Sequence, residues 1–225
     1  IMALTKFNFN SFDVTTAASK GLGFNASANG FSTIDPGAMT LIKTLTASSS
    51  STLSFVHGSS DVVLDSTYPV YLFKFINVHP SSTDVNGESF KFNLSVDSGS
   101  NYNVSKTSTH FYAIHTEADS TAFSYYVGGD LANGTGDQIL TAELGGGNDE
   151  SVSGELYLFN PSSTTFVKNF ISRVSEYRAS DGVANNYVSG YGNTTSAINA
   201  VQFSMIRSGE TIQSGTFKLY GIKDS

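Results

Sequence analysis

The stretch FKFNLSV, Phe90 to Val96, decides the fold class of this sequence. Its four apolar residues stand at every second position, and lysine, asparagine and serine fill the positions between them. Neighbouring side chains of a β-strand point to opposite faces, so the alternation predicts a strand with one apolar and one polar face. A turn is expected directly afterwards, at Asp97 to Asn101, where Ser, Gly and Asn are concentrated.

Similar alternation recurs along the rest of the chain. The run at 71–76 is apolar at nearly every position, which predicts a strand covered on both faces. Pro161 ends another run, and Gly221 is expected to close the last one. Including these, the sequence predicts about ten short strands separated by turn signals, the pattern of a β-sandwich. The clearest runs besides Phe90–Val96 are residues 71–76, 155–159, 166–171, 201–205 and 217–220.

The first 40 residues have a different character. Phe7, Phe9 and Phe12 alternate with polar residues, but glycines and a proline then interrupt the pattern. We therefore expect an N-terminal arm or edge segment at 1–40 and a β-sandwich body at 41–225. The segment either packs on its own domain or lies along another surface, and in the second case the three phenylalanines are the expected interface residues.

Composition excludes several classes of protein. The chain has 225 residues, with 12 Lys+Arg against 19 Asp+Glu and a formal net charge of −7. Twelve basic residues spread through an acidic chain argue against nucleic-acid binding, which requires neutralisation of phosphates. The absence of cysteine rules out disulfides and cysteine zinc sites. No apolar stretch approaches the roughly 20 residues of a membrane-spanning helix, and we expect neither membrane attachment nor a secretory signal.

The residues that usually carry catalysis form no recognisable motif. GxSxG, HExxH and GxxxxGK[ST] are all absent. His110 and His115 are close in sequence, but a separation of five places their rings on opposite faces of a strand. We therefore expect no enzyme activity, no bound metal and no cofactor.

Three weaker possibilities remain open. The acidic loops at 97–101 and 148–150 could offer oxygen ligands to Ca²⁺, although solvated loops are the better interpretation. Glycoside hydrolysis would need two facing carboxylates, and the candidates are neighbours only in sequence: Glu143, Asp149, Glu150 and Glu155. Exposed tyrosines could instead stack on sugar rings, unless they pack inside the sandwich or at subunit contacts: Tyr112, Tyr125, Tyr126, Tyr187 and Tyr191.

The balance of charged and aromatic residues favours a subunit of a larger assembly. Charged residues make up 14% of the chain and aromatic residues 12%. Protein interfaces are depleted in Lys and Glu and enriched in Tyr and Phe. A weakly charged exterior also gives little self-repulsion.

Four stretches resemble short structural proteins of tailed bacteriophages, marine ones in particular. They are YPVYLFKFINVHP (68–80), GELYLFNPSSTTFVKNF (154–170), GYGNTTSAINAVQF (190–203) and SGTFKLYGIK (214–223). The last resembles the closing strand of many phage fibre and decoration domains, where a run such as GTIKLYGI ends a jelly-roll-like sandwich. The resemblance implies an all-β fold, a jelly-roll-like antiparallel β-sandwich with an extended N-terminal segment, in a virion protein without enzyme activity.

Two placements in the virion follow from this resemblance. In the first, the protein is a capsid decoration or cement protein, made in the host cytoplasm and carried on the capsid surface. It would bind the major capsid protein, self-associate as a homotrimer and bridge capsid subunits. In the second, it is a tail-fibre or receptor-binding module that binds host surface carbohydrate. The short length and the lack of a repetitive shaft favour decoration. A free carbohydrate-active enzyme is a third reading, disfavoured by the absent motifs and signal.

Overall fold

The structure is a computed structural model that describes residues 21–25, 27, 30–34, 37–82 and 88–223. Regular secondary structure in these residues consists of fourteen β-strands and no helix. Every strand pair whose register is described runs antiparallel. The expected all-β class and antiparallel sandwich are therefore confirmed.

The chain divides into two compact units, one formed mainly by Ile1–Thr40 and the other by Leu41–Asp224. The described part of the first unit is a hairpin of β1 (Gly21–Phe24) and β2 (Phe31–Ile34). The described residues of the expected N-terminal segment thus form a paired hairpin, and their glycines lie within or beside its strands. Phe7, Phe9 and Phe12 lie outside the described residues.

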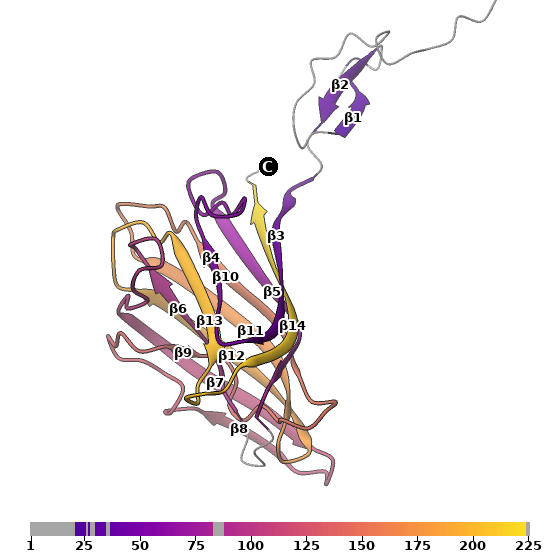
Figure 1. Ribbon diagram of the computed structural model, residues 1–225, viewed down its shortest axis with the longest axis vertical. Helices are drawn as coiled ribbons and strands as arrows, with labels where there is room; N and C mark the ends of the chain where they lie inside the picture. Colours follow the sequence, from indigo (N-terminus) through magenta and orange to yellow (C-terminus); the bar gives the residue numbers. More distant parts are fainter. Residues whose placement is uncertain (1–20, 26, 28–29, 35–36, 83–87, 224–225) are drawn as a thin grey trace, which may run out of the picture. The chain divides into compact units, whose positions relative to one another are not determined.

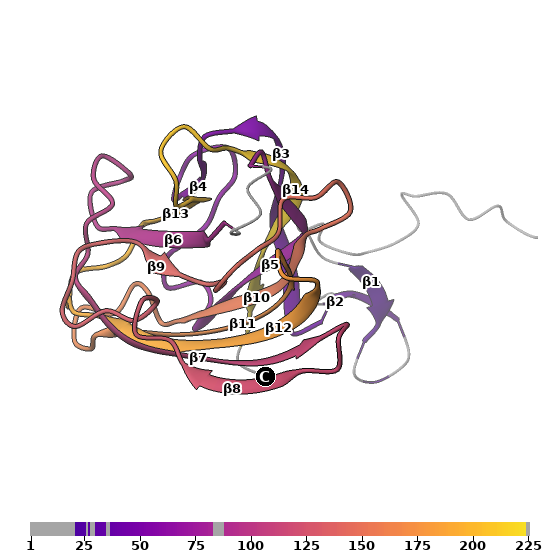
Figure 2. The ribbon, with the colours of Figure 1, turned by 90° about the horizontal axis from the view of Figure 1, so that it is seen from below.

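The second unit contains two sheets that lie face to face (Figures 1 and 2). The large sheet has the order β3-β14-β5-β10-β11-β12-β7-β8, and the small sheet has the order β4-β13-β6-β9. The strands of the large sheet are β3 (Met39–Ser50), β5 (Val70–Pro80), β7 (Lys106–Thr116), β8 (Thr121–Tyr125), β10 (Val152–Phe159), β11 (Lys168–Arg178), β12 (Gly182–Gly192) and β14 (Ile212–Ile222). Those of the small sheet are β4 (Leu53–Val56), β6 (Phe90–Ser95), β9 (Gln138–Ile139) and β13 (Ala200–Met205).

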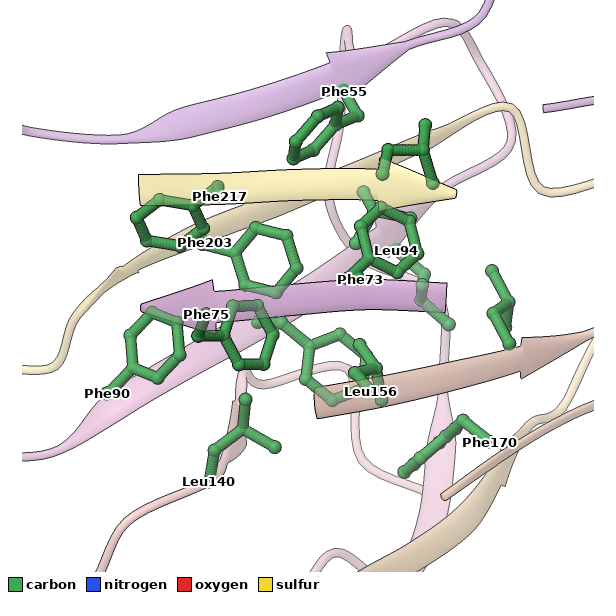
Figure 3. Close-up of a cluster of buried hydrophobic side chains, with 14 of the residues drawn as sticks. Phe55, Phe73, Phe75, Phe90, Leu94, Leu140, Leu156, Phe170, Phe203 and Phe217 are labelled. Atoms are coloured by element: carbon green, nitrogen blue, oxygen red, sulfur yellow. The ribbon is translucent and has the colours of Figure 1, made fainter. Parts of the chain in front are cut away.

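Phenylalanine rings from both sheets fill the space between them (Figure 3). Phe203 of β13 lies at the centre, with its ring centroid 5.0 Å from that of Phe75 and 5.8 Å from that of Phe90. Phe217 of β14 adds a further ring, 5.5 Å from Phe203. Edge-to-face and offset aromatic pairs contribute about 0.5–1.5 kcal/mol each beyond the burial of their area. The period-two phenylalanines of the sequence thus supply the core.

Three details of the predicted strands differ in the structure. The polar face of β6 is buried, since Asn93 donates to Asp137 and accepts a hydrogen bond from the Lys106 ammonium. The β11 strand begins at Lys168, and Phe166 before it is exposed. Gly221 does not close β14 but lies inside it, and a Cβ at this position would meet the ring of Tyr68 at 2.3 Å.

Candidate functional site

The large sheet has an inner face against the core and an outer face toward solvent. Strand β11 displays this division most clearly, because buried and exposed residues alternate along it. Its buried positions include polar as well as apolar side chains: Lys168, Phe170, Ser172, Val174 and Glu176. Candidate sites therefore lie in two places: on the outer face, and among the buried polar side chains of the inner face.

One hollow on the outer face has a volume of about 690 Å³ and lies where β7, β10, β11 and β12 meet the turns at their ends. Tyr177 lines it, and its hydroxyl lies 3.4 Å from Glu117 Oε1 and 3.5 Å from Asp181 Oδ1. Partial desolvation, followed by these carboxylates, raises the pKa of the Tyr177 hydroxyl. On the rim, His115 Nε2 lies 3.1 Å from Asp119 Oδ1. The hollow is acidic and lined by hydroxyl groups.

This hollow lacks the geometry of a hydrolase. Ser153 and Ser175 line it, but within the described residues the His115 ring hydrogen bonds only to Asp119. The Ser153 hydroxyl accepts from the Asn77 amide instead. A nucleophile must lie within hydrogen-bond reach of its base, so the structure assembles no Ser–His–Asp relay here.

A second hollow of about 340 Å³ lies on the outer face over β11, between the ends of β10 and β12. Phe159 of β10 forms one side and Tyr191 of β12 the other, while Asn169 and Ile171 of β11 form the floor. Ser189 completes the second side. None of the lining residues is charged.

Between the two hollows, one row of side chains crosses most of the outer face. The rings of Phe111 and Tyr187 stack with centroids 5.1 Å apart and an interplanar angle of 9°. The Arg173 guanidinium lies 5.4 Å from the centre of the Tyr187 ring. The row continues through Glu155, whose carboxylate lies 3.7 Å from the Lys74 ammonium. It is aromatic at one end and charged at the other.

The inner face of β7, β11 and β12 carries a buried polar cluster in place of the aromatic core. The Glu176 carboxylate is 1% exposed and accepts hydrogen bonds from the amides of Ala142 at 3.0 Å and Glu143 at 3.2 Å. Burial raises the pKa of Glu176 to about 7, against the opposing effect of these amides. Asn186 lies beside it and accepts a hydrogen bond from His110 Nε2 at 3.0 Å. Burial lowers the pKa of His110.

Two buried lysines extend the polar interior. Lys106 donates to Asn93 Oδ1 at 2.6 Å and to the Val104 carbonyl at 2.7 Å, and burial lowers its pKa to about 8. Lys168 donates to the carbonyls of Ser163 and Phe166, at 2.6 and 2.7 Å. Both ammonium groups bind chain oxygens, so their contacts are those of structural groups.

The sequence-predicted candidates are dispersed over the molecule. His110 is buried on the inner face of β7 and His115 is exposed on its outer face, as their odd separation predicts. His57 accepts from the Leu64 amide and His79 contacts the Glu150 carbonyl. Among the residues that the structure describes, no three His, Cys, Asp or Glu side chains form a group that could hold a metal ion.

The acidic candidates are engaged in local contacts. Asp97 accepts hydrogen bonds from the Asn101 side chain and from the Ser95 hydroxyl, which lower its pKa to about 2. Glu143 pairs with Arg178, and Glu150 accepts from the Gly147 amide. None of the four predicted glycosidase carboxylates lines either of the two hollows described above.

The five candidate tyrosines separate into two groups. Tyr112 and Tyr126 lie beside His110 on the inner side of the sheet, with ring centroids 6.4 and 5.1 Å from the imidazole. The other three lie at positions of the outer face: Tyr125, Tyr187 and Tyr191. The outer group is the one available to a ligand.

The β1–β2 hairpin carries an apolar face of its own. Leu22 and Phe24 are two residues apart, and Phe24 pairs with Phe31, so all three side chains lie on the same face. The rings of Phe24 and Phe31 stack at 5.2 Å, yet Phe24 remains 70% exposed. Sequence reasoning missed this face because the glycines of the segment suggested an irregular chain.

Sequence reasoning also missed the buried Glu176 and Asn186 side chains and the second hollow, the one over β11 that contains Asn169. A signal for the first existed, because Glu176 and Lys168 fall on the same alternate positions as Phe170 and Val174. A polar residue in register with core residues indicates a buried hydrogen-bonded group. The second hollow has no such signal, because its lining residues come from three strands, β10, β11 and β12, whose pairing brings them together.

The described residues include no helix that is long and apolar enough to cross a membrane. Comparison of the chain with protein-family models, with curated proteins and with solved structures found no match.

Proposed function

We propose that this chain is a structural protein of a phage virion, a capsid decoration or cement protein that binds the major capsid protein and bridges capsid subunits. The observation that carries the proposal is the exposed apolar face of the β1–β2 hairpin, in a compact unit separate from the sandwich body. The proposal assigns no catalysis and no cofactor.

The hairpin needs a partner for physical reasons. A two-stranded hairpin alone is marginally stable in water. This one has strands of four residues each, and the stretch Gly21–Ile34 contains no charged residue. Exposing Leu22 and Phe24 on one uncharged face is unfavourable. An apolar surface on a neighbouring capsid subunit would cover this face, and each ring buried would contribute on the order of 1.5–3 kcal/mol.

The strand order of the body supports a virion protein. With β7, β8, β11 and β12 set aside, the remaining eight strands pair as a nested hairpin: first with last (β3–β14), second with seventh (β4–β13), third with sixth (β5–β10) and fourth with fifth (β6–β9). A hairpin rolled up in this way is the arrangement of a jelly roll, a fold found in viral capsid and lectin domains. We infer a jelly roll with two inserted strand pairs.

Self-association into a homotrimer is part of the proposal. Strand β8 is the edge of the large sheet and exposes Phe123 and Tyr125, with Val127 just beyond it. An exposed edge strand with apolar side chains is prone to pairing with another chain. We therefore expect β8 to lie at the subunit contact, and the mass of the purified protein in solution tests this expectation.

The first experiment is localisation of the protein by cryo-electron microscopy of the purified virion. Density repeated over the icosahedral capsid is the expected result, since a cement protein bridges capsid subunits. Density restricted to the tail or its fibres would overturn the capsid placement.

The role of the hairpin is tested by Phe24→Ser. We expect incorporation into particles to fall at least tenfold, because the substitution removes the most exposed ring of the apolar face. Phe166→Ser is the matched control, because it removes a similarly exposed ring of the body that no proposed contact uses, and it should leave incorporation unchanged. Equal incorporation of the Phe24→Ser and unmodified proteins would contradict the assigned role.

The alternative is a tail-fibre or receptor-binding module for host surface carbohydrate. The specific observation that favours it is the set of aromatic side chains on the outer face of the large sheet, including Tyr187 and Tyr191. Tail density in the same microscopy experiment would favour this function.

A further inference from the structure

We infer that the hollow over β11, walled by Phe159 and Tyr191 and floored by Asn169, is a binding site for an uncharged sugar ring of a glycan. The inference is independent of where the protein lies in the virion. It goes beyond the cement function, since bridging capsid subunits requires no sugar site.

The first support is the aromatic wall on β10. Tyr157 and Phe159 are two residues apart on the outer face, and their rings are nearly parallel, with an interplanar angle of 14° and centroids 6.3 Å apart. The two rings therefore stack as a pair, and Tyr157 holds aromatic surface beside Phe159, the ring that lines the hollow. The weakly polar C–H face of a pyranose packs on such a surface, and only its hydroxyl groups require polar partners.

The second support is the facing wall and its distance. Tyr191 of β12 pairs with Asn169 of β11, and β10 lies on the other side of β11. The two aromatic walls therefore stand on β10 and β12, with β11 between them. Two strand spacings separate these walls by about 9.5 Å. A sugar ring in van der Waals contact of about 3.5–4 Å on each side needs about 7–8 Å, so this spacing leaves room for one ring.

The third support is the polar floor. Asn169 lies at the centre of the hollow and is exposed, and its side-chain amide makes no hydrogen bond with the described residues. An amide offers two donors and an acceptor, which can match adjacent hydroxyl groups of a sugar. The Ser189 hydroxyl lies on the Tyr191 side of the hollow and is 3.1 Å from the Thr109 hydroxyl. It supplies a second polar group.

Charge selects the class of ligand. The hollow contains no Lys, Arg, His, Asp or Glu. Arg173 is the next outward-facing residue of β11 after Ile171 of the hollow, and it pairs with Glu155 of β10. This neighbouring pair carries charges of both signs. A phosphate, sulfate or uronic acid would lose hydration without gaining a counter-ion. A neutral hexose presents the combination of apolar face and hydroxyl groups that this lining accommodates.

The test is titration of the purified protein with neutral oligosaccharides, namely maltohexaose, cellohexaose and mannohexaose, followed by saturation-transfer NMR and tyrosine fluorescence. Oligoguluronate is the charged comparison. We expect at least one neutral oligosaccharide to bind and oligoguluronate to bind at least tenfold more weakly. No binding of the three neutral probes at 10 mM, or preferential binding of oligoguluronate, would overturn the inference.

Two variants locate the site. Tyr191→Ala removes one wall and should weaken binding at least tenfold. Ile171→Trp places a larger side chain on the floor and should block binding, although both aromatic walls and Asn169 stay in place. Tyr125→Ala is the matched control, an exposed tyrosine on β8 of the same outer face. Thermal melting checks that each variant folds. Binding that survives both groove variants, or that is lost equally in Tyr125→Ala, would place the sugar elsewhere and reject the assignment.

Discussion

Individual polar residues in the interior are held by specific partners. Burying a carboxylate, an amide or an imidazole without a hydrogen bond costs several kcal/mol. In this protein Glu176 accepts two main-chain amides and Asn186 accepts from His110. These contacts reduce the cost of burial but do not cancel it, because the pKa of Glu176 is still raised to about 7.

The raised pKa makes stability depend on pH in a defined direction. The Glu176 pKa is about 7 in the folded protein against 4.5 as its ordinary value, so the folded state retains the proton longer. The free energy of unfolding therefore falls as pH rises from about 4.5 to about 7 and then levels, by up to about 3 kcal/mol from this group. Glu176→Gln removes the titration. We expect urea unfolding to give similar stability for variant and wild type near pH 4.5 and a more stable variant at pH 8.

The control for this prediction is Glu155→Gln, which alters the partly exposed carboxylate paired with Lys74 on the outer face. Its stability difference from wild type should not follow the same pH course, because surface pairs contribute little. A constant difference between Glu176→Gln and wild type from pH 4.5 to 8 would contradict the role given to burial.

Among the elements, position in the sheet sets local stability. Strands β5 and β10 have neighbours on both sides and contribute buried Phe and Leu side chains to the core. Strand β8 pairs only with β7, and its residues are largely exposed. Local opening costs least where few apolar contacts are broken. The large sheet therefore ends at β8 in a weakly held edge.

Hydrogen exchange measures this difference between strands. We expect the amides of β8 to exchange roughly tenfold or more faster than those of β5, because opening β8 does not disturb the aromatic core. Exchange followed by mass spectrometry resolves the two segments. Equal protection of β8 and β5 in a monomeric sample would contradict this prediction, because pairing with β7 alone would not explain it. Protection that increases with protein concentration would support β8 as the subunit contact.

At the scale of the whole molecule, the sandwich body contains its own core. All buried residues of the main hydrophobic cluster come from positions 47 to 219, within the second unit. The body therefore has what a domain needs to fold alone. The hairpin unit lacks such a core in its described part, and the proposed function assigns the cover of its apolar face to a capsid subunit.

Removal of residues 1–40 separates these roles. We expect the shortened protein to melt within about 2 °C of the full chain, since the core is unchanged. It should no longer join the particle, because the proposed anchor is gone. Calorimetry and incorporation into virions measure the two outcomes. Full incorporation of the shortened protein would refute the anchor, and a large loss of stability would refute an independent body.

The sequence by itself determined the class of fold and much of the core. Period-two runs place Phe90, Phe92 and Leu94, and likewise Phe203 and Phe217, on buried faces, because successive side chains of a strand alternate between faces. The same rule separates His110 from His115. These properties are local, so they can be read from neighbouring residues.

Only the tertiary structure decided the order of the strands and the surroundings of the polar residues. The pairing of β10 with β5 and of β12 with β7 joins residues far apart in the chain, and no local pattern encodes it. Pairing of the consecutive strands β10, β11 and β12 brings Phe159, Asn169 and Tyr191 into one hollow. Asn93 and Glu176 are instead buried against partners from distant segments, Asp137 for Asn93 and Ala142 for Glu176. Whether a polar side chain faces water or a hydrogen-bonding partner depends on which distant segment covers it, and folding establishes that relation through long-range contacts.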